Sequence, residues 1–195
     1  MNRNLEKLLV ITTFMGLGIA TAYAADHDPK AISALLKQSN VSLLEGIDVA
    51  EKTSGVATSA KFEVDAGKLV LSVYTVPEGL GVEPEKATLT EVGGDAMESP
   101  FKPKVEVFSD KEHIARASVH MTLFQVSHLT LKQVIQQALK QKAGVPIDVR
   151  NPMIRNHRPI ADVVIVASNQ EAFTVTVDLL NGKASLKTAT TTAKP

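Results

Sequence analysis

The chain has 195 residues, with 21 basic and 21 acidic side chains, five histidines, and neither cysteine nor tryptophan. Its basic residues are interleaved with acidic ones, so it lacks the basic face that binds nucleic acid, and the missing cysteines exclude disulfides and thiolate chemistry. The length suits one domain or two small ones, stabilised by an ordinary hydrophobic core.

Residues 1–24 have the features of a secretory signal peptide. A positively charged start precedes an uncharged apolar run at 8–20, and the small residues Ala22 and Ala24 match the positions that a signal peptidase reads. The run is shorter than the roughly 20 residues that span a bilayer, which favours cleavage over an anchor helix. We therefore expect a periplasmic or secreted protein that begins at Ala25, with no membrane span after cleavage.

Cleavage would make the new N-terminus a candidate metal site, because His27 would then be the third residue, after Ala25 and Asp26. The free α-amine, two backbone amide nitrogens and the imidazole can surround one ion in a plane, a geometry that suits Cu(II) or Ni(II). No other cofactor is expected.

Two segments that lie 88 positions apart begin alike and predict two helices. Each opens with a capping box, formed by Ser42 with Glu45 and by Thr130 with Gln133. Apolar residues then recur at spacings of four and three, which places them on one helical face. These residues are Leu43, Ile47 and Ala50 in the first segment and Leu131, Ile135 and Ala138 in the second. Each stripe predicts a buried face.

After each helix the hydrophobic period changes to that of a strand. We expect Gly55 and Gly144 to end the helices. Residues 60–73 alternate on either side of an Asp-Ala-Gly-Lys turn, and the second segment has an apolar strand at 160–167 followed by alternation at 173–177. Each unit is therefore predicted to be a helix followed by an antiparallel hairpin.

An excursion rich in Gly, Pro and Glu separates the two units at 77–103, and we expect it to be an inserted loop. Strand-like alternation at 104–108 and at 114–126 predicts an extra hairpin around Asp110. On the second of these strands His120 is predicted to lie on the more polar face, as a surface or groove residue.

The order helix, glycine, strand, turn, strand, closed by the segment Asp178–Lys183, resembles the PepSY domain family. That family consists of small α+β modules found in exported proteins and in the propeptides of some secreted metallopeptidases. The resemblance implies an α+β fold with two PepSY-like units, each a helix packed on an antiparallel sheet, and roles in binding or in peptidase inhibition. It implies no catalytic residue.

This interpretation divides the chain into four parts. They are a signal peptide at 1–24, a first PepSY-like unit with the inserted loop and the extra hairpin at 25–127, a second unit at 128–186, and a disordered tail at 187–195.

A basic segment bracketed by prolines, residues 151–159, is the candidate for partner binding. Arg150, Arg155, His157 and Arg158 lie in it or beside it, and together they can dock an acidic segment of a partner. The alternative interpretation is a solvated connection between two strands.

The sequence contains no nucleophile elbow, no phosphate-binding loop and no zinc-peptidase helix motif. The leading hypothesis is therefore a non-catalytic periplasmic module that recognises a protein or peptide partner and modulates a peptidase, with no catalytic residues. A sheet edge to which the partner adds a strand is one expected mode of binding. The alternative hypothesis is a periplasmic protein that binds a metal or a small ligand.

Mature protein that begins at Ala25 is expected to bind one Cu(II) through its first three residues. Its affinity should rise steeply with pH, because the amine and amide groups must lose protons, and calorimetric titration would measure this. His27→Ala, or one extra residue before Ala25, should abolish binding without changing the melting temperature of the metal-free protein. Copper binding that survives the extension would place the ligands elsewhere in the chain.

Overall fold

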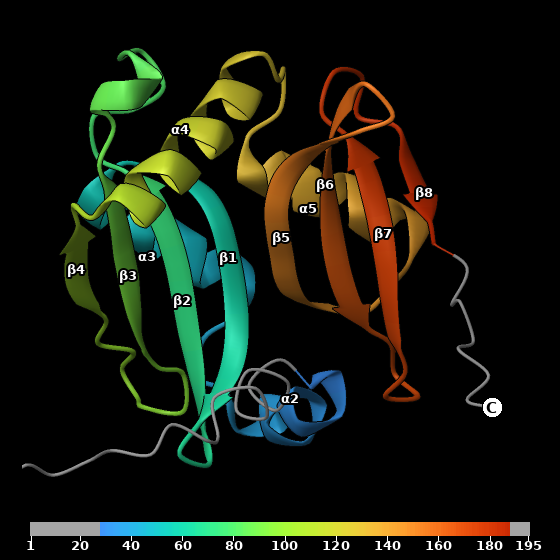
Figure 1. The fold of residues 1–195 in the computed structure, drawn as a ribbon. Coiled ribbons are helices and arrows are strands. Elements are labelled where there is room, and N and C mark those ends of the chain that lie inside the picture. The colour runs from blue at the N-terminus through green and yellow to red at the C-terminus, as the bar shows by residue number, and fades with distance from the viewer. Residues whose placement is uncertain (1–27, 188–195) are drawn as a thin grey trace, which may run out of the picture.

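The computed structural model describes residues 28–187 (Figure 1). Its elements, in chain order, are α2 (Pro29–Leu35), η1 (Leu36–Gln38), α3 (Leu43–Ser54), β1 (Val56–Asp65), β2 (Lys68–Val76), η2 (Pro84–Lys86), β3 (Leu89–Asp95), β4 (Lys104–Phe108), α4 (Lys111–Gln125), α5 (Leu131–Gln141), β5 (Val145–Arg155), β6 (Arg158–Val166), β7 (Ala172–Asp178) and β8 (Ala184–Leu186). Here α denotes α-helices, η short 3-10 helices and β strands.

All eight strands form one antiparallel sheet in the order β4-β3-β2-β1-β5-β6-β7-β8, so the expected α+β fold class is confirmed. Two helices precede β1–β4, and two more precede β5–β8. Each half of the sheet therefore contains four strands and not a single hairpin. Figure 1 shows α3 behind β1 and β2, α5 behind the second half of the sheet, and α4 across the top of the first half.

The two predicted helix starts are confirmed. Both capping boxes form, at the first turns of α3 and α5, and all six residues of the two apolar stripes are buried. Gly55 ends α3 with a positive φ of 102°, and a Cβ there would lie 2.6 Å from the carbonyl oxygen of Val76.

The predicted end of the second helix is wrong by two residues. Helix α5 ends at Gln141, and its C-cap is Lys142 in an extended conformation. Glycine is required at position 144 for another reason. A Cβ at this position would lie only 2.4 Å from the carbonyl oxygen of Val166. The glycine therefore allows the chain to approach β6 closely as it enters β5.

The hairpins β1–β2 and β6–β7 are also confirmed. Asp65 pairs with Lys68 at the tip of the first hairpin, and Val166 pairs with Ala172 at the end of the second. Local patterns, alternation in β1, β2 and β7 and an apolar run in β6, are sufficient to predict both, because each hairpin pairs strands that are adjacent in the chain.

The excursion at 77–103 is not only a loop, since it contains strand β3, which pairs with β2 and β4. Two glycines near the end of β3 weaken its strand signal. One of them, Gly93, has a structural reason: a Cβ there would lie 3.0 Å from the carbonyl oxygen of Leu71 and 3.1 Å from Oε1 of Glu91.

The predicted strand at 114–126 is wrong, because this segment lies in helix α4. Asp110 is the N-cap and accepts hydrogen bonds from the amides of Glu112 and His113. The buried positions Ala117, His120, Met121 and Phe124 have helical spacing and face the protein. His120 is consequently 2% exposed and is not a surface or groove residue.

The two halves of the sheet meet at a short ladder but share one core. Strands β1 and β5 pair only at Ala60↔Val149 and Lys61↔Asp148. The main apolar cluster nevertheless contains Ile47 and Ile135 together with residues from both halves. Across residues 28–187, no helix is long and apolar enough to cross a membrane.

Replacement of either Ile47 or Ile135 by alanine should lower the free energy of unfolding by about 2–5 kcal/mol, because each side chain is fully buried. Since the two residues share one core, each variant should shift a single unfolding transition of the whole protein in chemical denaturation. Val119→Ala on the exposed side of α4 is the matched control and should change the stability by no more than about 0.5 kcal/mol. Two separate transitions would contradict the shared core.

Candidate functional site

One face of the sheet is covered by helices and is apolar. Helix α3 packs directly on Leu71, since a Cβ at Gly46 would lie 2.1 Å from Cδ2 of Leu71. Side chains alternate along a strand, so Ser72 and Tyr74 point to the opposite face. Helix α4 covers part of this opposite face, where its Met121 belongs to a small apolar cluster with β2 and β3.

That opposite face also bears charged and polar side chains, beside apolar ones such as Ile160 and Val164, and we call this set of charged and polar residues the charged face. It comprises Lys61, Glu63, Ser72, Tyr74 and Glu91 in the first half and Asp148, Arg155, Asp162, Thr176 and Lys187 in the second. The cross-strand register aligns these residues: Lys61, for example, pairs with Ser72 on one side and with Asp148 on the other.

In the first half, two carboxylates lie on either side of a buried hydroxyl. Ser72 Oγ donates to Oε1 of Glu91 at 2.6 Å and lies 3.3 Å from Oε1 of Glu63. The ammonium of Lys61 is 2.7 Å from Oε2 of Glu63 and 5.9 Å from the centroid of the Tyr74 ring. These contacts join β1, β2 and β3 into one polar cluster.

Tyr74 completes the first cluster. Burial raises the pKa of its phenol, and the charge of Glu91 and a hydrogen bond to the same carboxylate raise the pKa further. The phenol therefore stays protonated at neutral pH and can act as a donor in this cluster.

In the second half, one aspartate accepts hydrogen bonds from three side chains. The side chain of Asp162 is 7% exposed, and it accepts from Nη2 of Arg155 at 2.9 Å, from Oγ1 of Thr176 at 2.6 Å, and from Nζ of Lys187. Burial alone would raise the pKa of Asp162, but the hydrogen bonds from Arg155, Lys187 and Thr176 outweigh it and lower the pKa. The carboxylate therefore remains charged in the folded protein.

The basic segment at 151–159 is a hairpin and not a loop. Strand β5 runs to Arg155, β6 begins at Arg158, and Asn156 and His157 form a two-residue turn with positive φ angles of 50° and 61°. Such a turn matches the twist of antiparallel strands. Prolines normally argue against a strand. Those of β5 are tolerated because they lie at points where the register of the β5–β6 pairing shifts.

Three of the four predicted partner-binding residues lie at the tip of this hairpin, where Arg155 pairs with Arg158 across the strands and His157 lies in the turn. Arg155 is paired with Asp162, and Arg158 Nε is paired with Asp178 on β7. His157 is exposed at the turn. The side chain of Arg150 is not among those that the structure describes, although its backbone pairs with Asp162.

The predicted metal ligands Ala25, Asp26 and His27 lie outside the described residues, as do the signal sequence and residues 188–195 of the predicted tail. Lys187, the first residue of that tail, pairs with Asp162. Within the described part of the chain, no group of three or more His, Cys, Asp or Glu side chains is arranged to hold a metal.

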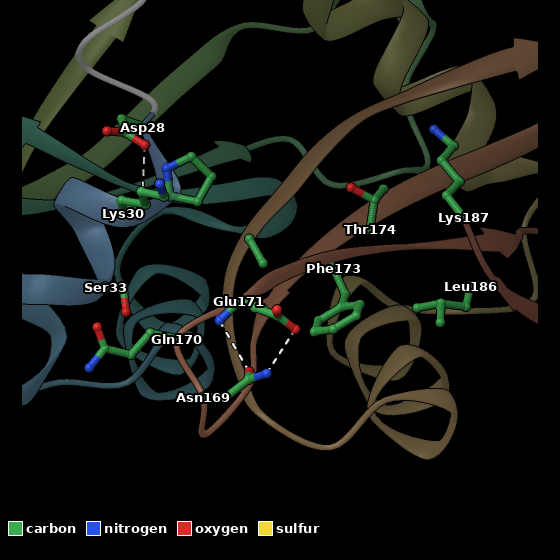
Figure 2. Close-up of a pocket in the computed structure, with 12 residues that line it drawn as sticks. Asp28, Lys30, Ser33, Asn169, Gln170, Glu171, Phe173, Thr174, Leu186 and Lys187 are labelled. Atoms are coloured by element: carbon green, nitrogen blue, oxygen red, sulfur yellow. Dashed lines mark hydrogen bonds between the residues drawn. The ribbon is translucent and has the colours of Figure 1, made fainter. Parts of the chain in front are cut away.

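A cavity of about 1090 Å³ lies between α2, the turn that joins β6 and β7, and the hairpin of β7 and β8. Figure 2 shows Asp28, Lys30 and Ser33 on the side of α2, with Phe173, Thr174 and Lys187 on the side of the sheet. Most of its lining residues are polar or charged, and Phe173 and Leu186 are the large apolar side chains among them. No local sequence pattern indicates this cavity, because its walls come from residues 28–33 and 169–187, which are far apart in the chain.

No family model matches the sequence, and no curated protein matches it. Among solved structures, the chain is similar to a candidate lipoprotein from Clostridium difficile 630, with 16% sequence identity and a TM-score of 0.37. The similarity covers 76% of this chain and 95% of that one. A similarity of this size does not define a family.

His120 is a buried base without a hydrogen-bond partner at Nδ1. Burial, together with a smaller effect of the charge of Arg116, lowers the pKa of His120 to about 4. Between pH 4 and pH 6.5 the unfolded chain therefore binds a proton at His120 that the folded protein does not.

The free energy of unfolding should consequently be highest above pH 6.5 and should fall by about 3 kcal/mol as the pH drops to 4. Urea unfolding at several pH values would measure this slope. His120→Leu removes the titrating group and should flatten the curve in this window, while the loss caused by Asp162 at still lower pH remains. If the free energy of unfolding fell equally with pH in the wild type and in His120→Leu, protonation of His120 would not destabilise the folded protein, and the prediction would be wrong.

Proposed function

We propose that the protein is an exported, non-catalytic binding module that recognises a polypeptide partner through the charged face of its sheet. Export rests on the signal-like start of the chain, and the resemblance to PepSY-like units supports a binding role. The observation that carries the proposal is the charged face itself, where ion pairs and hydrogen bonds hold polar side chains in place on a surface that α3 and α5 leave uncovered.

The paired side chains are still accessible to a partner. The side chains of Arg155 and Lys187 are 37% and 41% exposed, although both contact Asp162. A side chain that is already fixed loses little conformational entropy when it binds, so a preorganised surface gains affinity. The internal pairs therefore prepare the surface for binding without removing it from solvent.

The two clusters also have opposite charge. Lys61, Glu63 and Glu91 give the first cluster an excess of negative charge, and Arg155, Lys187 and Asp162 give the second an excess of positive charge. The centres of the clusters, on β2 and β6, are three strand spacings apart across the sheet, or about 14 Å, and are offset by two residues along the strands. This pattern favours a partner that presents basic and acidic groups at a similar separation, because complementary charges give specificity.

The geometry also favours binding over hydrolysis at this face. Ser72 lies beside two carboxylates, which is how a base activates a nucleophile, but its side chain is fully buried. A substrate cannot reach that hydroxyl. The carboxylates instead serve as acceptors that fix the surface.

Small-ligand binding is the second candidate, and the cavity beside α2 is the observation that favours it. This cavity combines the apolar side chains of Phe173 and Leu186 with charged and polar groups, and polar groups of this kind can fix the orientation of a small molecule. Modulation of a peptidase, by contrast, is proposed from the PepSY resemblance alone.

The proposal is tested by placing a photoreactive phenylalanine analogue at Val70, which lies on the charged face between Glu63 and Asp95. The same analogue at Gln136, exposed on α5, reports on the opposite side of the molecule. Irradiation of cells that express the full-length chain should yield a cross-linked protein from Val70 and not from Gln136. Mass spectrometry would identify the product.

Arg155→Gln combined with the analogue at Val70 should reduce the cross-linked product at least about tenfold, because it removes a positive group from the surface. The unfolding transition of each variant must be measured to show that the fold is retained. A folded protein that gives no product from Val70, or equal products from Val70 and Gln136, would overturn the proposal.

A further inference from the structure

Strand β4 is the outer strand at one edge of the sheet. It pairs through Lys104–Phe108 with β3, and among residues 28–187 no strand pairs with its other side (Figure 1). An edge of this kind presents backbone N–H and C=O groups that can pair with a further strand. The opposite edge, β8, has only three residues, Ala184–Leu186.

The β4 edge carries two exposed valines. Val105 and Val107 are 50% and 61% exposed, although the register places them on the apolar side of the sheet with buried partners, Val92 and Thr90. The apolar side therefore continues past the cover that α3 provides. One more strand along β4 would shield both valines.

The sequence of β4 is complementary to itself in one antiparallel register. When Val105 of one copy lies opposite Val105 of a second copy, Lys104 of each copy lies opposite Glu106 of the other. This register forms two cross-strand pairs of opposite charge and keeps all the valines on one side. The register centred on Glu106 would instead place two glutamates opposite each other, which is destabilising.

We propose that two copies of this chain associate through their β4 edges, antiparallel about Val105, and so form one continuous sheet with two-fold symmetry. The second copy is the occupant that the charge pattern of β4 fits. The interface is isologous, and it leaves the charged face of each copy open to a partner. The ladder is short, so the dimer is weak and dissociates on dilution.

Sedimentation equilibrium of the mature wild-type protein over a range of concentrations tests this. Wild-type protein should show a reversible monomer–dimer equilibrium that weakens at high salt. Lys104→Glu and Glu106→Lys should each raise the dissociation constant at least about tenfold, because each places like charges opposite one another. Lys140→Glu on the exposed end of α5 is the matched control and should dimerise as the wild type does.

An equimolar mixture of the two single variants provides the sharper test. In this mixture, every position 104 of one chain faces a position 106 of opposite charge in the other, so dimers should re-form, and only as heterodimers. The variants lie on an exposed edge, and unchanged unfolding curves would show that they fold. A monomeric wild type, single variants that dimerise as the wild type does, or a mixture that stays monomeric would each overturn the proposal.

Discussion

The packing of α3 and α5 against one face of a single sheet is the constraint on which the rest of the structure depends. Each helix has only one apolar stripe, centred on Ile47 or Ile135, and both stripes are fully buried. The ladder between β1 and β5 is only two residue pairs long. This short ladder is sufficient to join the two halves because they share one apolar core. Burial of that core provides most of the stability.

This one-sided packing determines what the other face can be. Strand geometry points alternate residues away from α3 and α5, and neighbouring strands lie close enough for their side chains to form pairs. Lys61 with Glu63, and Arg155 with Asp162, satisfy one another at this face. A surface that carries charge, order and partial exposure together is suited to recognition of another polar surface.

Much of the fold could be predicted from local sequence, but the charged face could not. The capping boxes and apolar stripes of α3 and α5 depend on residues within two or three turns, and the β1–β2 hairpin depends on neighbours in the chain. By contrast, Ser72 meets Glu91 and Asp162 meets Lys187 across 19 and 25 positions. Sequence alone places such residues on a polar face without showing which ones meet.

The elements that the sequence patterns predict wrongly or miss, α4, β3 and β5, have physical explanations. The segment that became α4 has apolar residues at both strand and helix spacings, and only its docking on η2, β3 and β5 decides between them. Strand β3 was hidden by two glycines, and β5 by prolines that lie at shifts in register. In each case tertiary pairing overrides a local preference.

Backbone hydrogen exchange of the mature protein tests most directly whether the two halves form one body that holds the charged face together. Under conditions where exchange reports opening free energies, the most protected amides of β1 and β2 and those of β5 and β6 should open with the same free energy, equal to that of global unfolding. If one half opened at a distinctly lower free energy while the other stayed protected, the halves would be separate bodies. The charged face would then not be a single rigid surface.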